Sequence, residues 1–226
     1  LRGNQLPSFE TNCIEEWETK LDKIVDETLG KDLTLIGGIP PWMQMYFDRI
    51  VERTGKPVIA SFPNLQVLVQ GGVNFEPYKA KLWETIGKNI DTIELFPASE
   101  GFFAFQDDRN EPGLLLNTNS GIFYEFIPIG EVHLENPTRL SLGEVKLGEQ
   151  YALIINSNAG LWGYSIGDIV KFVSTAPYRI IVAGRVKHFI SAFGEHVIGE
   201  EVEKAMLKVA NSMQASVVEF TVAPYI

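Results

Sequence analysis

A short polar turn between two apolar stretches carries a hydroxyl and a carboxylate side by side, at Ser99 and Glu100. The turn directly follows a predicted strand, at the carboxyl end, where open α/β sheets bind their ligands. A hydroxyl beside a hard oxygen anion suits a nucleotide–metal site in which Ser99 contacts a phosphate and Glu100 holds a magnesium ion. The alternative is a polar turn in which Ser99 caps the next segment, and residue types alone favour that alternative.

The same turn also invites comparison with the nucleophile elbow G-x-S-x-G of serine hydrolases, with Ser99 as the nucleophile. Pro97 stands where the first glycine is needed, and proline cannot adopt the positive φ that such turns often use. The three histidines of the chain supply no obvious Asp–His pair. The hydrolase interpretation is therefore disfavoured.

A glycine turn and an extended segment carry further charged residues. Asp168 follows a glycine turn, and its carboxylate could accept two hydrogen bonds from a ribose diol; otherwise it is an aspartate in a type II turn that enters the strand 169–173. Arg185 has a permanent, forked charge that could reach a phosphate or a ribose. Lys187 lies two residues on, and the alternative for this pair is two solvated cations. The glycine pairs 37–38 and 71–72 are, taken alone, typical of turns at strand ends, since the sequence has neither a P-loop nor a G-x-G-x-x-G pattern.

The first hundred residues alternate helices and strands that could position these groups. Helices are predicted over 14–29, over 42–53 and from Pro77, and strands over 33–36, 65–70 and 93–96. Asn12 and Glu15 form a predicted capping box for the first helix, which Gly30 ends. Helix–strand alternation of this kind predicts a parallel sheet with helices packed on it.

The pattern changes near residue 101, and the chain becomes strand-rich. Separated by turn residues, strands are predicted over 102–106, 114–116, 122–128, 151–156, 169–173 and 179–182. This section is predicted to be antiparallel and barrel-like. The turn 193–195 is then expected to start a helix over 199–211 with Val202, Ala205, Met206 and Val209 facing inward, and 216–222 is a predicted last strand.

Composition narrows the class of protein. The chain has 226 residues, about one and a half domains at roughly 150 residues each. A formal net charge of −10 disfavours nucleic-acid and anionic-membrane partners. The sequence contains no apolar run long enough to span a membrane, and no Cys/His cluster at zinc-ligand spacing. Its one cysteine, Cys13, fits a reducing compartment, so we expect a cytoplasmic protein.

Taken in order, the motifs are more specific than any one of them. Gly71-Gly72, the run F-P-A-S-E-G at 96–101, Y-S-I-G-D at 164–168 and G-R-V-K at 184–187 resemble the sequential motifs of acyl-adenylate-forming enzymes. The segments 38–43, 62–65, 71–78, 98–104 and 121–128 are similar to the auxin-responsive Gretchen Hagen family. The chain resembles a bacterial-type member of that family over essentially its whole length.

The resemblance implies a partial adenylate-forming-enzyme fold of the α/β class. That fold has a mostly parallel sheet with flanking helices, an antiparallel barrel-like section, and the start of a small α+β C-terminal domain. Residues 1–183 would be the later part of the large adenylating domain, with an α/β layer over 1–100 and the antiparallel section over 101–183. Residues 184–226 would open the small mobile domain. The family's phosphate loop would lie before Leu1, and an adenylation lysine used by many relatives would lie after Ile226.

The resemblance also assigns roles in a site for ATP and Mg²⁺. Gly71 and Gly72 match the strand end that lies against the adenine, and Phe96 matches the aromatic residue that stacks on it. Asp168 matches the ribose acceptor and Arg185 a ribose or phosphate contact.

Ser99 and Glu100 match the catalytic positions of the family. Ser99 corresponds to the phosphate-contacting hydroxyl and Glu100 to the magnesium-binding carboxylate. Lys187 replaces the aspartate about which the small domain of many relatives rotates, which leaves its role as a hinge open.

The activity implied is that of an acyl-acid amido synthetase. Such a ligase adenylates a small-molecule carboxylic acid with MgATP and transfers the acyl group to the amine of an amino acid, releasing AMP. Two alternatives stay open: an acyl-CoA synthetase that uses the same first half-reaction, and a catalytically silent nucleotide-binding or regulatory domain. We expect the fragment alone to be inactive in adenylation.

Overall fold

The computed structural model describes residues 5–186, 190–192, 195–197 and 199–213. The chain divides into two compact units, the first built on residues up to Ile93 and the second on residues from Glu94. The change from the helical to the strand-rich section therefore falls at 93–94, close to the predicted change of character near residue 101. Among the described residues, no helix is long and apolar enough to cross a membrane.

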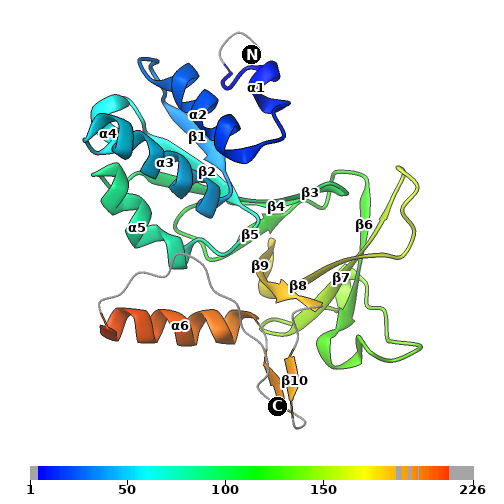
Figure 1. The fold of residues 1–226 in the computed structure, drawn as a ribbon. Helices are drawn as coiled ribbons and strands as arrows, with labels where there is room; N and C mark the ends of the chain where they lie inside the picture. The colour runs from blue at the N-terminus through cyan, green and yellow to red at the C-terminus, as the bar shows by residue number, and fades with distance from the viewer. Residues whose placement is uncertain (1–4, 187–189, 193–194, 198, 214–226) are drawn as a thin grey trace. The chain divides into compact units, whose positions relative to one another are not determined.

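The first unit is a helical layer on two parallel strands (Figure 1). Strand β1 (Leu35–Gly38) pairs in parallel with β2 (Val67–Gly71), so that Gly38 lies opposite Gln70. The helices are α1 (Phe9–Asn12), α2 (Trp17–Thr28), α3 (Pro40–Thr54), α4 (Val58–Ser61) and α5 (Glu76–Ile86). The predicted parallel pairing is confirmed for β1 and β2.

Two predicted helices end at the glycines that the sequence marks as their ends: α2 ends just before Gly30, and α3 ends at Gly55. Helix α3 has a proline in its first turn and ends at Gly55, whose φ of 65° is left-handed. The predicted capping box of the first helix is wrong. Helix α2 begins later, because the side chain of Glu16 caps it by accepting from the backbone N–H groups of Glu18 and Thr19. Asn12 instead ends α1.

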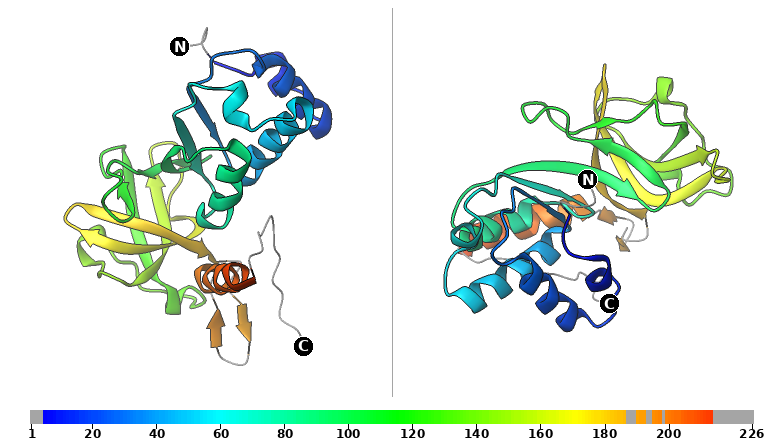
Figure 2. Two further views of the ribbon diagram at one scale, coloured as in Figure 1. Left: turned by 90° about the vertical axis from the view of Figure 1, so that its left-hand side faces the viewer. Right: turned by 90° about the horizontal axis from the view of Figure 1, so that it is seen from above.

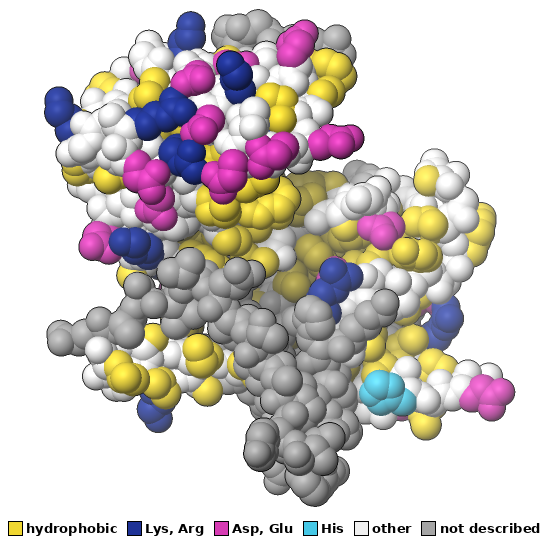
Figure 3. Space-filling view, viewed as in Figure 1, with side chains coloured by type: hydrophobic (Ala, Val, Ile, Leu, Met, Phe, Trp, Pro, Cys, Tyr) yellow, Lys and Arg dark blue, Asp and Glu magenta, His cyan; other side chains and the backbone are white. Residues whose placement is uncertain are grey.

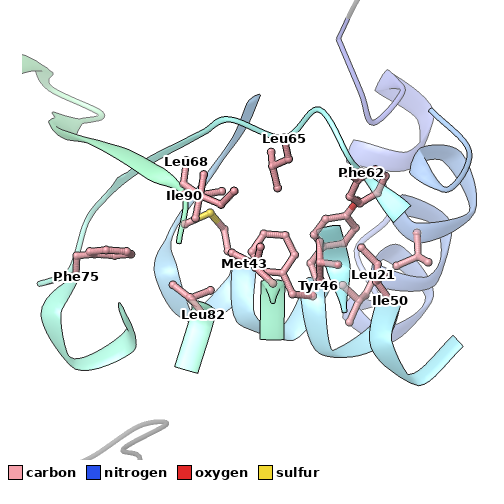
Figure 4. Close-up of a cluster of buried hydrophobic side chains, with 14 residues drawn as sticks. Leu21, Met43, Tyr46, Ile50, Phe62, Leu65, Leu68, Phe75, Leu82 and Ile90 are labelled. Atoms are coloured by element: carbon pink, nitrogen blue, oxygen red, sulfur yellow. The ribbon is translucent and has the colours of Figure 1, made fainter. Parts of the chain in front are cut away.

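The core of the first unit lies between these helices and the strands. Figure 4 shows Met43, Tyr46 and Ile50 of α3 directed toward the same interior as Leu65 and Leu68. Phe47, Ile50 and Leu65 are completely buried, and burial of each such side chain contributes roughly 1.5–3 kcal/mol relative to exposure. Apolar spacing along α3 thus fixes which face of the helix meets the strands.

Charged side chains occupy the outer face of the same helices. Arg53 of α3 forms an ion pair with Asp22 of α2 at 2.9 Å, and Arg49 bonds Glu18 and Asp22. Figure 3 shows acidic and basic side chains interspersed over this helical part. Exposed pairs of this kind add little stability one by one, so they chiefly set which side of α2 and α3 faces water.

The second unit is an antiparallel sheet. Its strands follow the order β3-β4-β5-β9-β8-β7-β6, and every adjacent pair in that order is antiparallel. The strands are β3 (Asp91–Ala98), β4 (Gly101–Phe105), β5 (Leu114–Leu116), β6 (Ile122–Pro128), β7 (Gln150–Ser157), β8 (Tyr164–Thr175) and β9 (Tyr178–Arg185). Two short 3₁₀ turns, Ile129–Glu131 and Leu142–Glu144, lie between β6 and β7. The predicted antiparallel section is present, with a longer β8 and β9 than the sequence predicts.

Aromatic rings fill the interior of the second unit. Phe172 of β8 is completely buried, and its ring centroid lies 5.1 Å from that of Phe126 and 6.0 Å from that of Tyr151, both in edge-to-face geometry. Figure 2 shows the long strands β8 and β9 from two further directions. In the aromatic-rich run at 123–126, Tyr124 and Phe126 are buried in this core, while Phe123 is exposed.

The described C-terminal part contains one hairpin and one helix. Strands β10 (Ile190–Ala192) and β11 (Glu195–Val197) pair antiparallel, so Glu195 starts a strand rather than the final helix. Helix α6 spans Gly199–Met213, as predicted to within two residues. The predicted inward face is wrong in part: Ala205 and Val209 are exposed, whereas Ala210 is buried. Lys187 and the predicted strand 216–222 lie outside the described residues.

Candidate functional site

Ser99 and Glu100 form the two-residue loop of the β3–β4 hairpin. Ala98 pairs with Gly101 across the hairpin, so that only these two residues connect the strands. Ser99 is exposed and Glu100 half-buried. A nucleophile elbow joins a strand to a helix, whereas this turn joins two antiparallel strands. The hydrolase interpretation of Ser99 therefore has no support in the local fold.

Asp168 lies in an irregular segment of β8 rather than in a type II turn. The register between β7 and β8 shifts so that Ala152 faces Ile169 while Ile154 faces Ser165, which leaves extra residues on β8. Gly167 in this bulge has a φ of 83°. Such a bulge redirects the side chains next to it, and Asp168 comes to lie opposite Arg185 of β9.

Asp168 and Arg185 form an ion pair at the end of β9. The guanidinium Nε of Arg185 lies 3.2 Å from Oδ1 of Asp168, and its Nη2 donates to the carbonyl oxygen of Ile166 at 2.9 Å. The Asp168 side chain is 15% exposed, and that of Arg185 is 55% exposed. Arg185 therefore keeps donors open to the surface while it stays fixed to the bulge.

The electrostatic environment of Asp168 opposes its ionisation. Burial raises the pKa of Asp168 above its usual value, the nearby charge of Arg185 acts in the opposite direction, and the charge of Glu100 raises the pKa further. A carboxylate whose pKa is shifted by burial and by a specific charged neighbour is a candidate for a functional site. The predicted residues Glu100, Asp168 and Arg185 are thus brought together.

Tyr164 is a member of this group to which the sequence analysis gave no role. Its hydroxyl donates to Oε1 of Glu100 at 3.3 Å, although the two residues are 64 positions apart in the chain. Tyr164 is 41% exposed. Only the pairing of β8 with its neighbours brings the start of β8 to the β3–β4 loop, so no local pattern could have indicated the contact.

Phe96 is placed differently from what a stacking surface needs. It is 6% exposed and packs edge-on against Phe103, with 5.3 Å between ring centroids. Phe96 thus belongs to the aromatic core beneath the hairpin in this structure. Its role as the aromatic residue that stacks on adenine stays a prediction.

Gly71 and Gly72 lie in the first unit. Gly71 ends β2 at the carboxyl end of the parallel pair, and Gly72 follows with a φ of 86°. The carboxyl end of parallel strands is the edge at which α/β sheets bind ligands. Their placement against an adenine also stays a prediction.

The carboxylate of Glu100 suits a magnesium ion that takes its other ligands from a nucleotide and from water. The described residues contain no group of three or more His, Cys, Asp or Glu side chains that could hold a metal alone. Mg²⁺ bound with a nucleotide usually takes one or two carboxylates, with phosphate oxygens and water completing the octahedron. Glu100, half-buried in a turn with Asp168 near it, fits the single-carboxylate case.

Replacing Gly167 with alanine is expected to destabilise the chain by roughly 1–3 kcal/mol, because its φ of 83° is strained for other residues. An added Cβ would also lie 3.3 Å from Nη2 of Arg185. Urea unfolding followed by circular dichroism measures the change. Gly130→Ala is the control, because nothing lies within 4 Å of a Cβ there, and a loss equal to that of the control would contradict the expectation.

Part of the sequence matches a known family. Residues 115–185, which include β8 and Asp168, match the GH3 family central domain. The chain is 34% identical over 118 residues to jasmonoyl-L-amino acid synthetase JAR4 of Nicotiana attenuata, covering 49% of this chain and 20% of that protein. It is 38% identical over 58 residues to indole-3-acetic acid-amido synthetase GH3.3 of Arabidopsis thaliana, covering 24% of this chain and 10% of that protein.

Solved structures show the same fold. A GH3.15 acyl acid amido synthetase superposes with a TM-score of 0.70 at 11% identity, covering 94% of this chain and 48% of that one. A 2-hydroxyisobutyryl-CoA ligase, in complex with 2-HIB-AMP and CoA, superposes with a TM-score of 0.61 at 12% identity, covering 84% and 44%. The predicted α/β fold of adenylate-forming enzymes is confirmed. The chain spans about a fifth of JAR4 and a tenth of GH3.3.

Proposed function

We propose that this chain, whose matches support the GH3 family, is part of an ATP-dependent acyl-acid amido synthetase. The enzyme adenylates a small-molecule carboxylic acid and passes the acyl group to the amine of an amino acid. One observation carries the proposal: the second unit brings the half-buried Glu100, the ion-paired Asp168 and the partly exposed Arg185 together from three separate sequence motifs.

Each of these groups has a role in holding the nucleotide. Asp168 accepts hydrogen bonds from the ribose hydroxyls, and Arg185 contacts the ribose or a phosphate from the neighbouring strand. Ser99 offers an exposed hydroxyl to a phosphate from the β3–β4 loop. Gly71 and Gly72 of the first unit, with Phe96, are proposed for the adenine.

The chemistry explains why charges of both signs are needed. A carboxylate that attacks the α-phosphorus of ATP brings negative charge onto negative charge, and fixed donors must offset that charge in the transition state. Bound Mg²⁺, held by Glu100, would supply such charge neutralisation at the phosphates. Asp168 and Arg185 lower the entropic barrier by fixing the sugar, which leaves the α-phosphorus in a defined place for in-line attack.

An acyl-CoA synthetase is the second candidate, because a CoA ligase shares this fold. Both candidates predict the same first half-reaction, and they differ in the acceptor. The full-length enzyme is expected to exchange pyrophosphate into ATP in the presence of its acid. It should then form an amide with an amino acid and no thioester with CoA, and the reverse result would favour the ligase.

The 226-residue chain itself provides the direct test of the nucleotide site. We expect it to bind AMP, and to bind AMP at least about tenfold more tightly than 2′,3′-dideoxy-AMP, because the diol supplies both hydrogen bonds to Asp168. Isothermal titration calorimetry measures both affinities. Equal affinities would contradict the ribose assignment, and a chain that binds neither nucleotide would contradict the proposed nucleotide site. No adenylation is expected from this chain by itself.

We also propose a compartment and a class of partners for the enzyme. A single cysteine and a net charge of −10 support a cytoplasmic protein whose partners are small molecules rather than nucleic acids or membranes. The bacterial character of the chain is carried by the sequence resemblance alone, because the amido synthetases compared above are plant enzymes.

A further inference from the structure

The hydroxyl of Tyr164 is the hydrogen-bond donor that the structure gives to the Glu100 carboxylate. Within the described part of the chain, the contact from the Tyr164 hydroxyl to Oε1 at 3.3 Å is the one hydrogen bond of this carboxylate. Glu100 and Asp168 repel each other, since the charge of Glu100 raises the pKa of Asp168. A neutral donor on one oxygen of Glu100 reduces that repulsion without supplying a competing cation.

The backbone just before Tyr164 is held on two sides. The N–H of Gly163 donates to Oδ1 of Asn156 at 2.6 Å, and Nδ2 of Asn156 donates to Oε2 of Glu125 at 2.8 Å. Arg139 also donates to Oε2 of Glu125, at 3.2 Å. A Cβ at Gly163 would lie 2.9 Å from Nη1 of Arg139.

This polar clamp, formed by Glu125, Arg139 and Asn156, connects three segments of the second unit. Glu125 lies on β6 and Asn156 on β7, where they belong to adjacent strands, and Arg139 lies on the connection between these strands. Side chains locked by such hydrogen bonds are more precisely placed than side chains on free loops. The clamp holds the backbone at the start of β8, directly before Tyr164.

We propose that Tyr164 is a positioning residue for metal-assisted nucleotide binding: its hydroxyl, held in place by the clamp at Gly163, orients the Glu100 carboxylate toward the cation that accompanies the phosphates. The inference rests on the proposed function. It connects Tyr164 of β8 to Glu100 of the β3–β4 loop. The start of β8 would then position the metal-binding carboxylate, while Asp168 binds the ribose.

The test compares ATP binding by the chain in Mg²⁺ with binding in EDTA, for the parent sequence and for Tyr164→Phe. Tyr164→Phe keeps the ring and removes only the donor, so it is expected to reduce the Mg²⁺-dependent gain in ATP affinity by about three- to tenfold. Tyr124→Phe is the matched control, because the Tyr124 hydroxyl donates to the carbonyl of Asn117 at 3.1 Å, away from Glu100. Titration calorimetry gives the affinities, and thermal unfolding shows that each variant is folded.

The outcomes separate the two levels of the proposal. A full Mg²⁺-dependent gain in Tyr164→Phe would overturn the inference and leave the nucleotide site intact. An equal loss in Mg²⁺ and in EDTA would also overturn it, since Tyr164 would then touch the nucleotide directly. If the parent chain binds AMP but gains nothing from Mg²⁺ with ATP, the inference fails alone. If the parent chain binds neither AMP nor ATP, the proposed function fails and the inference fails with it.

Discussion

Asp168→Asn is expected to weaken AMP binding by about ten- to a hundredfold, because hydrogen bonds to a charged acceptor contribute roughly 1.5–3 kcal/mol. Asparagine keeps the shape of the side chain. It removes the negative charge that pairs with Arg185 and that accepts the hydrogen bonds of the ribose hydroxyls. Titration calorimetry with the 226-residue chain measures the loss. Asp108→Asn is the control, since Asp108 is exposed and accepts hydrogen bonds from Asn110 of the same turn, and unchanged affinity in Asp168→Asn would contradict the ribose assignment.

The same residue predicts a pH dependence with a definite sign. The pKa of Asp168 is raised in the folded chain, chiefly by burial and further by Glu100. The carboxylate therefore becomes protonated at a higher pH than an ordinary aspartate, and a protonated carboxyl is the weaker acceptor. AMP affinity is expected to fall as the pH is lowered through that raised pKa, and Asp168→Asn should abolish this dependence.

The stability of the folded chain changes in the opposite sense over that pH range. An acid with a raised folded pKa binds its proton more tightly in the folded state than in the unfolded state. Its contribution to the free energy of unfolding is therefore greatest below the unfolded pKa and is lost as the pH rises through the folded pKa. A loss of AMP affinity at low pH is therefore not caused by a loss of stability from Asp168, because the contribution of Asp168 to stability is greatest at low pH.

Phe172→Ala is expected to lower the free energy of unfolding by about 3–5 kcal/mol, the usual loss for a buried phenylalanine. The ring is completely buried and lies against three other aromatic rings, those of Phe126, Tyr151 and Tyr178. Because Phe172 lies on β8, the cavity is also expected to loosen the strand that carries Asp168.

Urea unfolding followed by circular dichroism measures this loss. Phe123→Ala is the matched control, since Phe123 is 61% exposed and its removal is expected to change the free energy of unfolding by about 0.5 kcal/mol or less. A loss at Phe172 no larger than that of the control would show that the aromatic cluster does not hold this sheet together.

Much of the fold was predictable from local signals. Helix α3 follows from a proline pair, an apolar stripe and Gly55, and the strands β5 and β6 have the bounds that their apolar runs and flanking turns predict. These elements are specified by residues close in sequence. The switch from parallel to antiparallel pairing was visible because turn residues become frequent after residue 101.

The parts that could not be predicted depend on contacts between distant residues. Glu16, and not Asn12, caps α2. The glutamate side chain can accept from the backbone N–H groups of Glu18 and Thr19 only after the chain has turned at this point. The face of α6 that is buried is set by its neighbours, and Ala210 rather than Val209 is buried. Phe96 packs edge-on against Phe103, a contact that depends on how β3 pairs with β4.

The candidate site divides in the same way. The order of the motifs and the family resemblance, rather than residue types alone, pointed to Glu100, Asp168 and Arg185. The bulge at Gly167 and the contact from Tyr164 to Glu100 were not visible, since both arise from strand register. The charged residues lie in short motifs, whereas the contacts that hold them in position arise only in the folded chain.

The two-residue loop at Ser99 and Glu100 determines where this chain tolerates changes of length. Ala98 and Gly101 already pair, so one inserted residue would shift the register or turn Glu100 away from Tyr164. The turns at 108–112 and 118–120 are exposed and are the natural places for insertions. Among related chains, the number of residues between β3 and β4 is therefore expected to stay constant, while the lengths of those turns vary. This constant spacing can help to align related sequences whose identity is too low for alignment by identity alone.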